Sequence, residues 1–455
     1  MQHRSPTTRR TFLKGLGVAG AAAAAAPHVV PARVLGADAP SNKLNIALLG
    51  AGGRGQGILP WSENVIAAAD ANAGQLARLK NSKRPGAEKV KLYEDYRKLL
   101  DQEKSLEGVV VAAGQRWHVY MSKAAMLAGK HVFCEKPLCH SAAEAREIRE
   151  LAKKCKVATQ IGSQGGSSGS FRRSMEVIQA GVLGPVREVH CWITRSFPKS
   201  AAIDTNEDPI PEGLNWDCWC GPSKVLPFKK YYLGGCLAWG RWLEYGDGHL
   251  ADMGAHGLNL PWRALKLGTV LKASVEIPEP LKDSYPSATK FRWDFAARGN
   301  MPEAALYWHD GPKAGPPEEL GKELLSTYKK VPNDGVLFAG EKGILFSNAW
   351  GVGGVVRLKG DEKCRGVLDH EACKPVPATL PKGTDHMGEW LRAAKAGEKT
   401  FQGFETAADI AEIAMVGIIT LRLGKPIEWD SEALKVKGMP EADPLVQREP
   451  RKKWL

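Results

Sequence analysis

A glycine-rich turn directly after a predicted strand is the feature that most constrains how this chain folds. The strand is expected over residues 44–49, and residues 50–55 read GAGGRG. Glycines in this turn let the backbone bend sharply and approach a pyrophosphate, which sits at the N-terminus of the following helix. Asp70 ends the next predicted strand, twenty residues after Gly50, where an acidic side chain accepts hydrogen bonds from an adenosine ribose. The spacing predicts a dinucleotide site formed by Gly50, Gly52, Gly53, Arg54, Gly55 and Asp70.

The carboxylate of Asp70 also sets the expected choice of cofactor. A negative charge beside the ribose repels a 2′-phosphate, so the sequence favours NAD over NADP. Arg54 leaves NADP as the alternative, because an arginine near this position tolerates the phosphate.

Short apolar strands alternate with helical patterns from Leu44 to about Gly162. Amphipathic stretches such as Val119–Ala128 and Ala142–Lys154 separate several of the strands, and Ser141 with Glu144 forms a capping box before the second stretch. This alternation predicts a parallel sheet with helices on both faces, a Rossmann domain over residues 42–164. Strands are expected at Leu44–Leu49, Val65–Ala69, Lys89–Tyr93, Gly108–Ala112, His131–Cys134 and Val157–Ile161.

The pattern changes after about Gly165, where strands dominate. One helix is expected at Phe171–Ala180, and a late helix, Thr406–Leu423, is expected to return across a second sheet. Alternating polar and apolar residues indicate an open sheet with one solvated or partner-covered face. The fold class is therefore α/β, with a mainly antiparallel α+β domain over residues 165–455. Its strands are expected at Arg187–Thr194, Leu271–Ile277, Ala288–Phe295, Ala304–His309, Ile344–Phe346 and Val355–Leu358.

The N-terminus carries the features of an export signal. Arg9 and Arg10 are followed by Phe-Leu-Lys and by an apolar run from Gly15 to Ala26. That run is too short for a bilayer span, which takes about 20 apolar residues. The pattern resembles a twin-arginine (Tat) signal peptide over residues 1–39, which makes the Tat export machinery a partner and the periplasm the destination. An uncleaved signal that anchors the protein is the alternative.

Composition excludes a disordered tail protein, a collagen-like repeat and a polytopic membrane protein. With 43% hydrophobic and 25% charged residues the chain has the balance of a globular protein, and its net charge of +13 is spread out. The basic tail, Arg448–Lys453, is predicted to be a solvated terminus, so nucleic-acid binding is not expected. Nine cysteines without a C-x-x-C pair argue against a structural zinc site, and most of the thiols are predicted to be small buried hydrophobes.

Three further segments complete the pattern. Residues 134–137 read CEKP and close the fifth strand, where ligands meet an open parallel sheet. Residues 215–222 read NWDCWCGP, and residues 248–256 read GHLADMGAH. Together with the glycine turn, these segments resemble the glucose–fructose oxidoreductase / inositol dehydrogenase (Gfo/Idh/MocA) family in its Tat-exported bacterial branch. The resemblance runs from the arginine pair to about Leu267 and then weakens.

The resemblance implies an NAD-dependent oxidoreductase that acts on a hydroxyl carbon of a sugar, polyol or glycoside. Because an export signal precedes the dinucleotide fold, we also expect the cofactor to be tightly bound. Lys136 would hydrogen-bond the reacting hydroxyl, His256 would be the general base on oxidation, and Asp252 would orient the substrate or the histidine. The resemblance also implies a dimer or tetramer of this chain. Further cofactor contacts are expected from Trp117, His118, Glu135, Lys136 and Gln164.

The residues themselves support the same chemistry. Hydride removal from an alcohol needs a base that titrates near neutrality, such as histidine, and a cation beside the oxygen. Asp252 and His256 are four residues apart and share one helix face, although a surface ion pair is the structural alternative. His249, Asp252 and His256 also have a spacing that could hold a divalent ion, but no fourth ligand suggests itself and no metal is predicted.

Aromatic residues favour a carbohydrate substrate. Six tryptophans fall between residues 192 and 262, and aromatic rings stack on the apolar faces of sugars, although core packing is the favoured explanation for any single one of them. Arg241, Tyr231 and Tyr232 are candidate contacts for substrate hydroxyls. Residues 113–118 read AGQRWH where the family commonly has Thr-Pro-Asp-His-x-His, so the substrate range is expected to differ. Two alternatives stay open: a redox-neutral NAD-dependent glycosidase or lyase, and a non-catalytic NAD- or sugar-binding protein.

Overall fold

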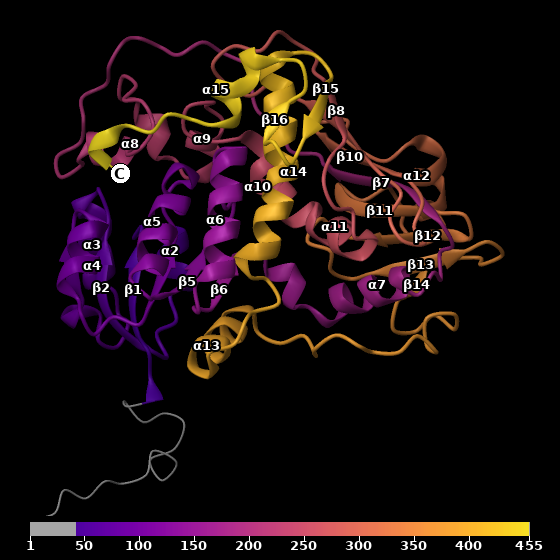
Figure 1. The fold of residues 1–455 in the computed structure, drawn as a ribbon, viewed down its shortest axis with the longest axis horizontal. Coiled ribbons are helices and arrows are strands. Elements are labelled where there is room, and N and C mark those ends of the chain that lie inside the picture. Colours follow the sequence, from indigo (N-terminus) through magenta and orange to yellow (C-terminus); the bar gives the residue numbers. More distant parts are fainter. Residues whose placement is uncertain (1–41, 455) are drawn as a thin grey trace, which may run out of the picture. The chain divides into compact units, whose positions relative to one another are not determined.

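The first sheet of the computed structural model, which describes residues 42–454, is parallel and has the strand order β3-β2-β1-β4-β5-β6 (Figure 1). This is the strand order of a Rossmann fold, and it confirms the predicted parallel sheet. Every residue of β4 is buried, as expected where helices cover both faces of a sheet. The strands are β1 (Asn45–Leu49), β2 (Asn64–Ala69), β3 (Lys91–Tyr93), β4 (Gly108–Val111), β5 (His131–Cys134) and β6 (Thr159–Ile161).

Helices connect these strands in the order that the alternation predicts. α6 has the expected bounds, and its cap forms as predicted, because Ser141 Oγ accepts from the Glu144 N–H at 3.2 Å. The Glu144 carboxylate reaches one residue further than expected and accepts from the His140 N–H at 2.7 Å. The helices are α2 (Gly53–Ile58), α3 (Ala73–Lys80), α4 (Tyr96–Gln102), α5 (Gln115–Leu127) and α6 (Ala142–Lys154).

The second sheet of the described residues has the order β14-β13-β12-β11-β7-β10-β9-β8-β15-β16. Only the β7–β10 pair in it is parallel, so the prediction of a mainly antiparallel sheet is confirmed. Its strands are β7 (Val186–Ile193), β8 (Lys272–Glu276), β9 (Thr289–Phe295), β10 (Ala304–Asp310), β11 (Asp334–Gly340), β12 (Gly343–Ser347), β13 (Val355–Leu358), β14 (Arg365–Gly366), β15 (Ile427–Asp430) and β16 (Lys435–Val436).

One strand in the middle of this sheet, β11, is absent from the sequence-based prediction. Its apolar run is only four residues long, Val336–Ala339, and Gly335 and Gly340 flank it. The structure explains Gly335, because a Cβ there would lie 2.8 Å from the Trp192 ring. Gly335 has no room for a side chain beside the neighbouring strand, so the alternating pattern by which a strand is recognised is interrupted there.

The late helix links the two sheets and fixes the helix that carries the candidate catalytic residues. α14 (Phe404–Leu423) packs against α6 on one side and against β8 and β9 on the other. At Gly417 a Cβ would lie 2.8 Å from the Trp293 ring, so helix and sheet are in close contact. α10 (Gly248–Gly257) packs against α14 and β10. The remaining helices are α7 (Gly169–Gln179), α8 (Trp216–Cys220), α9 (Cys236–Gly240), α11 (Asn259–Leu265), α12 (Glu318–Leu325), α13 (His386–Ala396) and α15 (Asp443–Val446).

The prediction of a solvated basic tail is wrong. Arg448 donates to the Glu244 carboxylate at 2.9 Å, and Arg451 pairs with Asp217. Trp454, which ends the described part of the tail, is only 5% exposed. Arg448 and Arg451 form ion pairs with carboxylates that are far away in the sequence. A local charge pattern does not reveal such partners.

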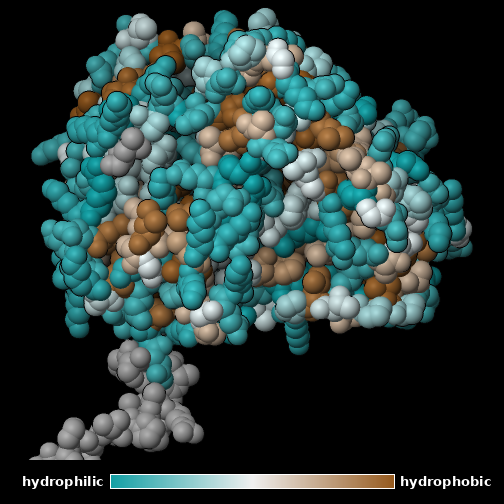
Figure 2. Space-filling view, viewed as in Figure 1, coloured by the Kyte–Doolittle hydropathy of each residue, from teal (hydrophilic) through white to brown (hydrophobic). Residues whose placement is uncertain are grey.

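The polarity of the surface and the burial of the cysteines agree with what the composition predicts. Figure 2 shows apolar side chains in separate groups among hydrophilic ones on the face in view. All nine cysteines lie within the described residues and are free thiols, and seven of them are buried, as predicted. Within residues 42–454, none of the helices combines the length and apolar character needed to cross a membrane. The predicted signal peptide, residues 1–39, lies outside the described residues.

Candidate active site and cofactor cavity

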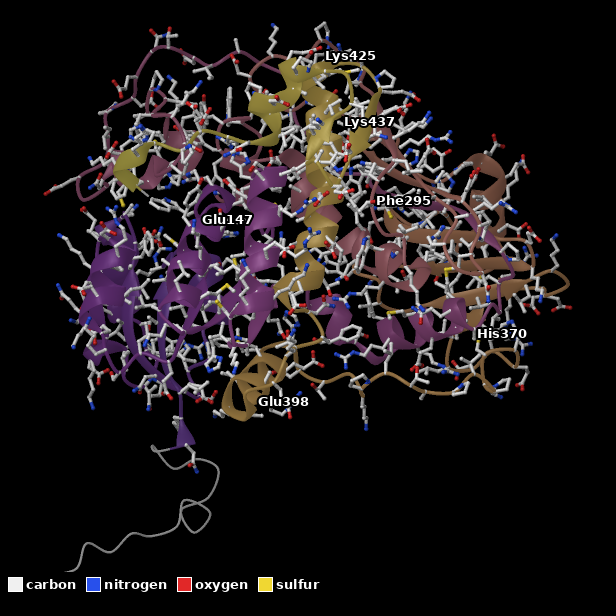
Figure 3. The ribbon with its side chains drawn as sticks, in the orientation of Figure 1. Glu147, Phe295, His370, Glu398, Lys425 and Lys437 are labelled. Carbon is white, nitrogen blue, oxygen red and sulfur yellow. The ribbon has the colours of Figure 1, made fainter. Side chains whose placement is uncertain are left out.

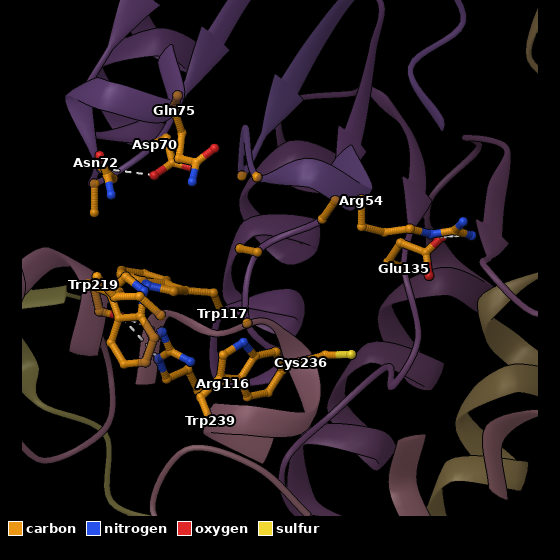
Figure 4. A pocket seen from close by; sticks show the side chains of 18 of the residues that line it. Arg54, Asp70, Asn72, Gln75, Arg116, Trp117, Glu135, Trp219, Cys236 and Trp239 are labelled. Atoms are coloured by element: carbon orange, nitrogen blue, oxygen red, sulfur yellow. Dashed lines mark hydrogen bonds and ion pairs between the residues drawn. The ribbon is translucent and has the colours of Figure 1, made fainter. Parts of the chain in front are cut away.

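A cavity of about 370 Å³ lies at the carboxyl ends of the parallel strands, where an open α/β sheet binds its ligands. One wall comes from the turns after β1, β2, β3, β4 and β5, and Figure 4 shows side chains of this wall. The opposite wall comes from α8 and from the segment around α9. Its lining residues include Cys218, Trp219, Tyr232, Leu233, Cys236 and Trp239.

The glycine turn presents bare backbone to this cavity. A Cβ on Gly52 or Gly53 would meet no heavy atom within 4 Å, so these positions border open space. Gly50 has a φ of +94°, which favours glycine, and a Cβ there would lie 2.5 Å from the Ala113 nitrogen. Gly55 is not among the described residues that line the cavity. A Cβ on Gly55 would lie 2.3 Å from the Gly50 oxygen, so this glycine packs closely against the turn. The turn fits a pyrophosphate lying directly on its main chain.

Asp70 lines the cavity at the end of β2, where the sequence predicts the adenosine ribose. Its Oδ2 accepts from the Ala51 N–H at 2.6 Å, and its Oδ1 accepts from the Asn72 N–H at 2.8 Å. Burial raises the pKa of the Asp70 carboxyl to about 6, although these hydrogen bonds oppose the shift. A second carboxylate, that of Glu94, lines the same cavity. Two acidic side chains at this end favour NAD over a cofactor with an additional phosphate.

Arg54 lies away from this acidic end. Its guanidinium donates to Glu135 Oε1 at 2.9 Å from Nε and at 2.6 Å from Nη2. Figure 4 shows the Arg54–Glu135 pair well separated from Asp70. The expectation that Arg54 tolerates a 2′-phosphate therefore finds no support in the geometry.

The raised pKa of Asp70 leads to a prediction on pH. Only the ionised carboxylate accepts hydrogen bonds from both ribose hydroxyls, and with a pKa of about 6 it is largely protonated at pH 5. We expect the affinity for NAD to fall by about tenfold between pH 7 and pH 5, the change expected when an acid is titrated one unit below its pKa. Quenching of tryptophan fluorescence by NAD measures this. Asp70→Asn should show a flat profile, and a flat wild-type profile would refute the assignment.

Lys136 lies at the end of β5 and lines the cavity. Its Nζ is 2.5 Å from Asp252 Oδ1 on α10, and both side chains are largely shielded from solvent. The Lys136–Pro137 peptide bond is cis. The two residues are far apart in sequence, and the structure brings them together as a charged pair beside the cofactor cavity.

His256 lies one helical turn after Asp252 and is buried. Burial and, next, the positive charge of Lys136 lower the pKa of His256 to about 3, while Asp252 acts in the opposite direction. Its Nδ1 has no hydrogen-bond partner among residues 42–454, and its ring centroid is 5.8 Å from that of Trp350. His256 is therefore a neutral imidazole in the electrostatic field of the Lys136–Asp252 pair. It does not belong to the described lining of the cavity.

His249 does not converge on the same point. Its ring stacks on Phe197 with centroids 3.9 Å apart, and neither ring nitrogen has a partner in the described part of the chain. Burial lowers the pKa of His249 to about 4. No group of three histidine, cysteine or carboxylate side chains in residues 42–454 is arranged to hold a metal ion.

Of the other residues predicted to contact the cofactor, Trp117 lines the cavity, whereas His118 and Gln164 are outside its described lining. Trp117 lines the cavity and donates from Nε1 to the Cys218 carbonyl at 3.2 Å. His118 instead contacts two loops: its ring nitrogens lie 2.6 Å from the Pro137 carbonyl oxygen and 2.8 Å from the Ala113 carbonyl oxygen. Burial lowers the pKa of His118 to about 4. Gln164 lies in a short 3-10 helix and is outside the described lining.

Of the three predicted substrate contacts, the structure brings only Tyr232 to the cavity. Its ring is buried there, and its hydroxyl has no partner within the described residues. Tyr231 is 41% exposed and stacks on Trp242. Arg241 donates to the Lys199 carbonyl at 2.8 Å and is not part of the described lining.

Arg116 is a cavity residue that the sequence analysis missed. It is buried, donates from Nε and Nη2 to the Trp219 carbonyl at 3.0 and 2.7 Å, and lies 3.7 Å above the Trp219 ring. Burial lowers the pKa of its guanidinium to about 10. Figure 4 shows it between Trp219 and Trp239. The departure from the family pattern at residues 113–118 was the signal that could have identified it. Other cavity residues that were missed are Asn72, Gln75, Glu94, Tyr96, Trp239 and Cys236.

Comparison with known proteins agrees with the first sheet. Residues 44–163 match the GFO_IDH_MocA family, described as oxidoreductases with an NAD-binding Rossmann fold, and residues 6–26 match the twin-arginine translocation signal. The chain is 33% identical to the uncharacterized oxidoreductase YfiI of Bacillus subtilis over 151 residues, which is 31% of this chain and 37% of that protein. It is 33% identical to inositol 2-dehydrogenase of Salmonella typhimurium over 102 residues, 22% of this chain and 30% of that enzyme.

A third relative belongs to a different class of enzyme. The chain is 30% identical to glycosyl hydrolase family 109 protein 2 of Shewanella sp. strain ANA-3 over 168 residues, 32% of this chain and 37% of that protein. The matched segments thus span about a third of the length of these curated relatives.

Solved structures share the fold of most of the chain at low identity. Aldose–aldose oxidoreductase from Caulobacter crescentus, complexed with glycerol, covers 85% of this chain and all of its own at a TM-score of 0.58 and 16% identity. Levoglucosan dehydrogenase in complex with NADH and L-sorbose covers 86% of this chain and all of its own at a TM-score of 0.55 and 16% identity. At these identities the likeness shows the fold.

Proposed function

We propose that this chain, whose residues 44–163 form a Gfo/Idh/MocA NAD-binding domain, transfers hydride between NAD and a hydroxyl carbon of a sugar, polyol or glycoside. The observation that carries the proposal is the Lys136–Asp252 pair, 2.5 Å apart at the cofactor cavity, with His256 on the same helix as Asp252. A cation and a neutral imidazole beside a dinucleotide cavity are the groups that alcohol oxidation requires.

Each of these side chains has a distinct task. NAD supplies the hydride acceptor when it is bound. Lys136 Nζ donates a hydrogen bond to the substrate oxygen and stabilises the negative charge that develops there, while Asp252 holds the ammonium group in place. A ring nitrogen of His256 takes the hydroxyl proton. The imidazole is neutral, as a base must be, but with a pKa lowered to about 3 it is a weaker acceptor than the base titrating near neutrality that the sequence predicts. Reduction of a carbonyl runs the same transfers in reverse.

A carbohydrate substrate fits the wall opposite the glycine turn. Trp219, Trp239 and Tyr232 line that wall, and aromatic rings pack well against the C–H faces of sugar rings. Inositol 2-dehydrogenase and levoglucosan dehydrogenase, to which the chain is similar, carry polyol and sugar substrates in their names. The Tyr232 hydroxyl, which is buried and has no hydrogen-bond partner within the described residues, is the contact that we assign to a substrate hydroxyl.

A redox-neutral reaction is the second candidate. In it the enzyme oxidises a sugar carbon, eliminates the aglycone, adds water to the double bond that the elimination leaves, and reduces the carbon again, so that a glycoside is hydrolysed without net change of NAD. The similarity to a glycosyl hydrolase family 109 protein favours it. The same Lys136, Asp252 and His256 would serve both reactions, because each begins with removal of a hydride.

The domain boundaries, the location and the oligomeric state that we propose are those predicted from the sequence. We assign residues 1–39 to a Tat signal, residues 42–164 to the NAD-binding domain and residues 165–455 to the substrate domain. The match to a Tat signal supports a periplasmic location. An oligomer of this chain, dimeric or tetrameric, is proposed by analogy with the family.

Incubation of the purified protein with a panel of sugars, polyols and glycosides tests the function. Nicotinamide absorbance reports net oxidation, and chromatography of the sugars reports cleavage without net reduction. A substrate that changes absorbance identifies a dehydrogenase, and one that is cleaved silently identifies the redox-neutral reaction. If cofactor binds and the full panel, tested alone and with a second carbonyl substrate, gives no oxidation, transfer or cleavage, the result favours a non-catalytic NAD- or sugar-binding protein.

Asp70→Ala should weaken NAD binding by about 10- to 100-fold and narrow its advantage over NADP. The change removes a charged acceptor of hydrogen bonds, worth about 1.5–3 kcal/mol, and the charge that repels a 2′-phosphate. Dissociation constants for both cofactors, measured by calorimetry, give the comparison. Asp101→Ala, which removes an exposed acid on α4 of the same domain, is the matched control. An unchanged ratio of the two affinities would mean that the glycine turn alone decides cofactor choice.

A further inference from the structure

The helix α8 forms the outer wall of the cofactor cavity, and the residues around it are fastened to the NAD-binding domain. Backbone hydrogen bonds join Ala73 N to Gly213 O and Asn215 N to Ala71 O, both at 2.9 Å. The loop that they hold directly follows Asp70. Asn215 Nδ2 also donates to the Glu94 carboxylate at 2.7 Å. Anything bound between Asp70 and α8 is therefore enclosed from both sides at the adenosine end.

A second set of contacts comes from the part of the chain after α15. We name residues 448–454 the strap, and Figure 1 shows it running from α15 back to α8. Arg451 donates from Nε to the Gly221 carbonyl at 2.9 Å and from Nη2 to the Asp217 carbonyl at 2.8 Å, and it pairs with the Asp217 carboxylate. Lys453 Nζ lies 2.6 Å from the other oxygen of that carboxylate. Asp217 is thus held by two cations of the strap.

The end of the strap reaches the opposite side of the cavity. Trp454 is buried and meets the Trp117 ring edge-on at 5.7 Å. Arg97 on α4 donates to the Lys453 carbonyl at 3.0 Å and lies 4.9 Å above the Trp454 ring. Trp117 itself lines the cavity and bonds to Cys218 of α8. The strap therefore bridges α8 and the NAD-binding domain across the outside of the cavity.

The ionic part of this bridge consists of two cations, Arg451 and Lys453, on the one carboxylate of Asp217. Burial alone would raise the pKa of Asp217, but hydrogen bonds from Lys453 and Arg451 lower it below its usual value. The side chains are partly open to solvent, with 35% of Asp217 and 69% of Lys453 exposed, so salt screens them. Opening of α8 then requires that these pairs separate and that Trp454 leaves Trp117.

We propose that the strap is a latch that retains NAD, with Asp217, Arg451 and Trp454 as positioning residues that hold α8 closed over the cofactor. None of the three lines the described cavity, so they act through α8 and Trp117. The inference rests on the NAD site of the proposed function. It concerns only how fast the cofactor leaves, so it is tested without any sugar substrate.

The test compares release of bound NADH from the full-length protein and from Asp217→Asn. Each protein is loaded with NADH and mixed with excess NAD, and nicotinamide fluorescence gives the release rate. We expect release at least tenfold faster from Asp217→Asn, and faster again from a chain that ends at Glu449. Asp217→Glu should restore slow release. Added salt should speed release from the wild type and have little effect on Asp217→Asn, which a merely structural role would not predict.

Lys425→Gln is the matched control. It breaks an ion pair of similar length, 3.0 Å to Glu441, in the same terminal region, and Figure 3 shows Lys425 well away from α8. Its release rate should equal that of the wild type. Melting temperatures show whether each variant is folded, and Lys453→Gln replaces any variant that is not. Equal release rates in wild type, Asp217→Asn and Lys453→Gln would overturn the latch while leaving the NAD site and its chemistry intact.

Discussion

Lys136→Ala should lower kcat on a true substrate by about 10²–10⁴, the range for losing a positioned group that stabilises developing charge. The ammonium group lies 2.5 Å from Asp252 at the cavity, where little solvent is present to replace it. Without it the alkoxide that precedes hydride transfer has no cation beside it. His256→Ala should cause a loss of the same size, because the hydroxyl proton then has no acceptor. Steady-state rates on any sugar identified in the panel measure both effects.

Cofactor binding should survive both changes, because the glycine turn and Asp70, which the changes leave intact, are the main predicted cofactor contacts. Fluorescence titration with NADH checks this and separates a chemical defect from an empty site. Lys123→Ala is the control, because it removes another lysine side chain, which pairs with Glu147 outside the cavity. Near-native turnover in Lys136→Ala or His256→Ala would show that the residue has been assigned wrongly.

The parts of this site that could be predicted from sequence are those set by short, local geometry. Gly50 and Asp70 are recognisable because a tight turn and a strand end fall at a fixed spacing in every dinucleotide-binding unit. Lys136 follows the fifth strand for the same reason, since ligands gather at the carboxyl ends of a parallel sheet. Its pairing with Asp252 could be anticipated only from the resemblance to a family, because the two residues are 116 positions apart.

The contacts that could not be predicted are long-range and have no periodic signature. Arg451 and Asp217 are 234 positions apart, so a basic tail looked like a solvated one. Arg116 was read as a departure from a family pattern, although its guanidinium holds the Trp219 carbonyl. His118 was expected at the cofactor, yet both of its ring nitrogens face backbone carbonyls that the sequence cannot place. Tertiary partners, more than local preference, decide such roles.

The exported protein should carry about one NAD per chain through purification without added cofactor, as expected for a dissociation constant near 1 nM, about −12 kcal/mol. A Tat signal at residues 6–26 precedes an NAD-binding domain, and Tat cargo folds before export, while the cofactor is scarce outside the cytoplasm. NAD that exchanged freely would be lost in the periplasm. The latch over α8 provides a physical route to slow release, and bound NADH must then be reoxidised in place, either by a second carbonyl substrate or by the same sugar after elimination.

Denaturation of the exported form, followed by enzymatic assay of the released NAD and NADH, measures this content. Asp70→Ala, exported and purified in the same way, should arrive largely empty because it lacks the acceptor for the adenosine ribose. The redox state of the released cofactor after treatment with a substrate also separates the two cycles, since a silent glycosidase returns it unchanged. Empty wild-type protein that works only with added NAD would rule out the closed cycle and leave an ordinary dehydrogenase, whose cofactor must be supplied where the enzyme works.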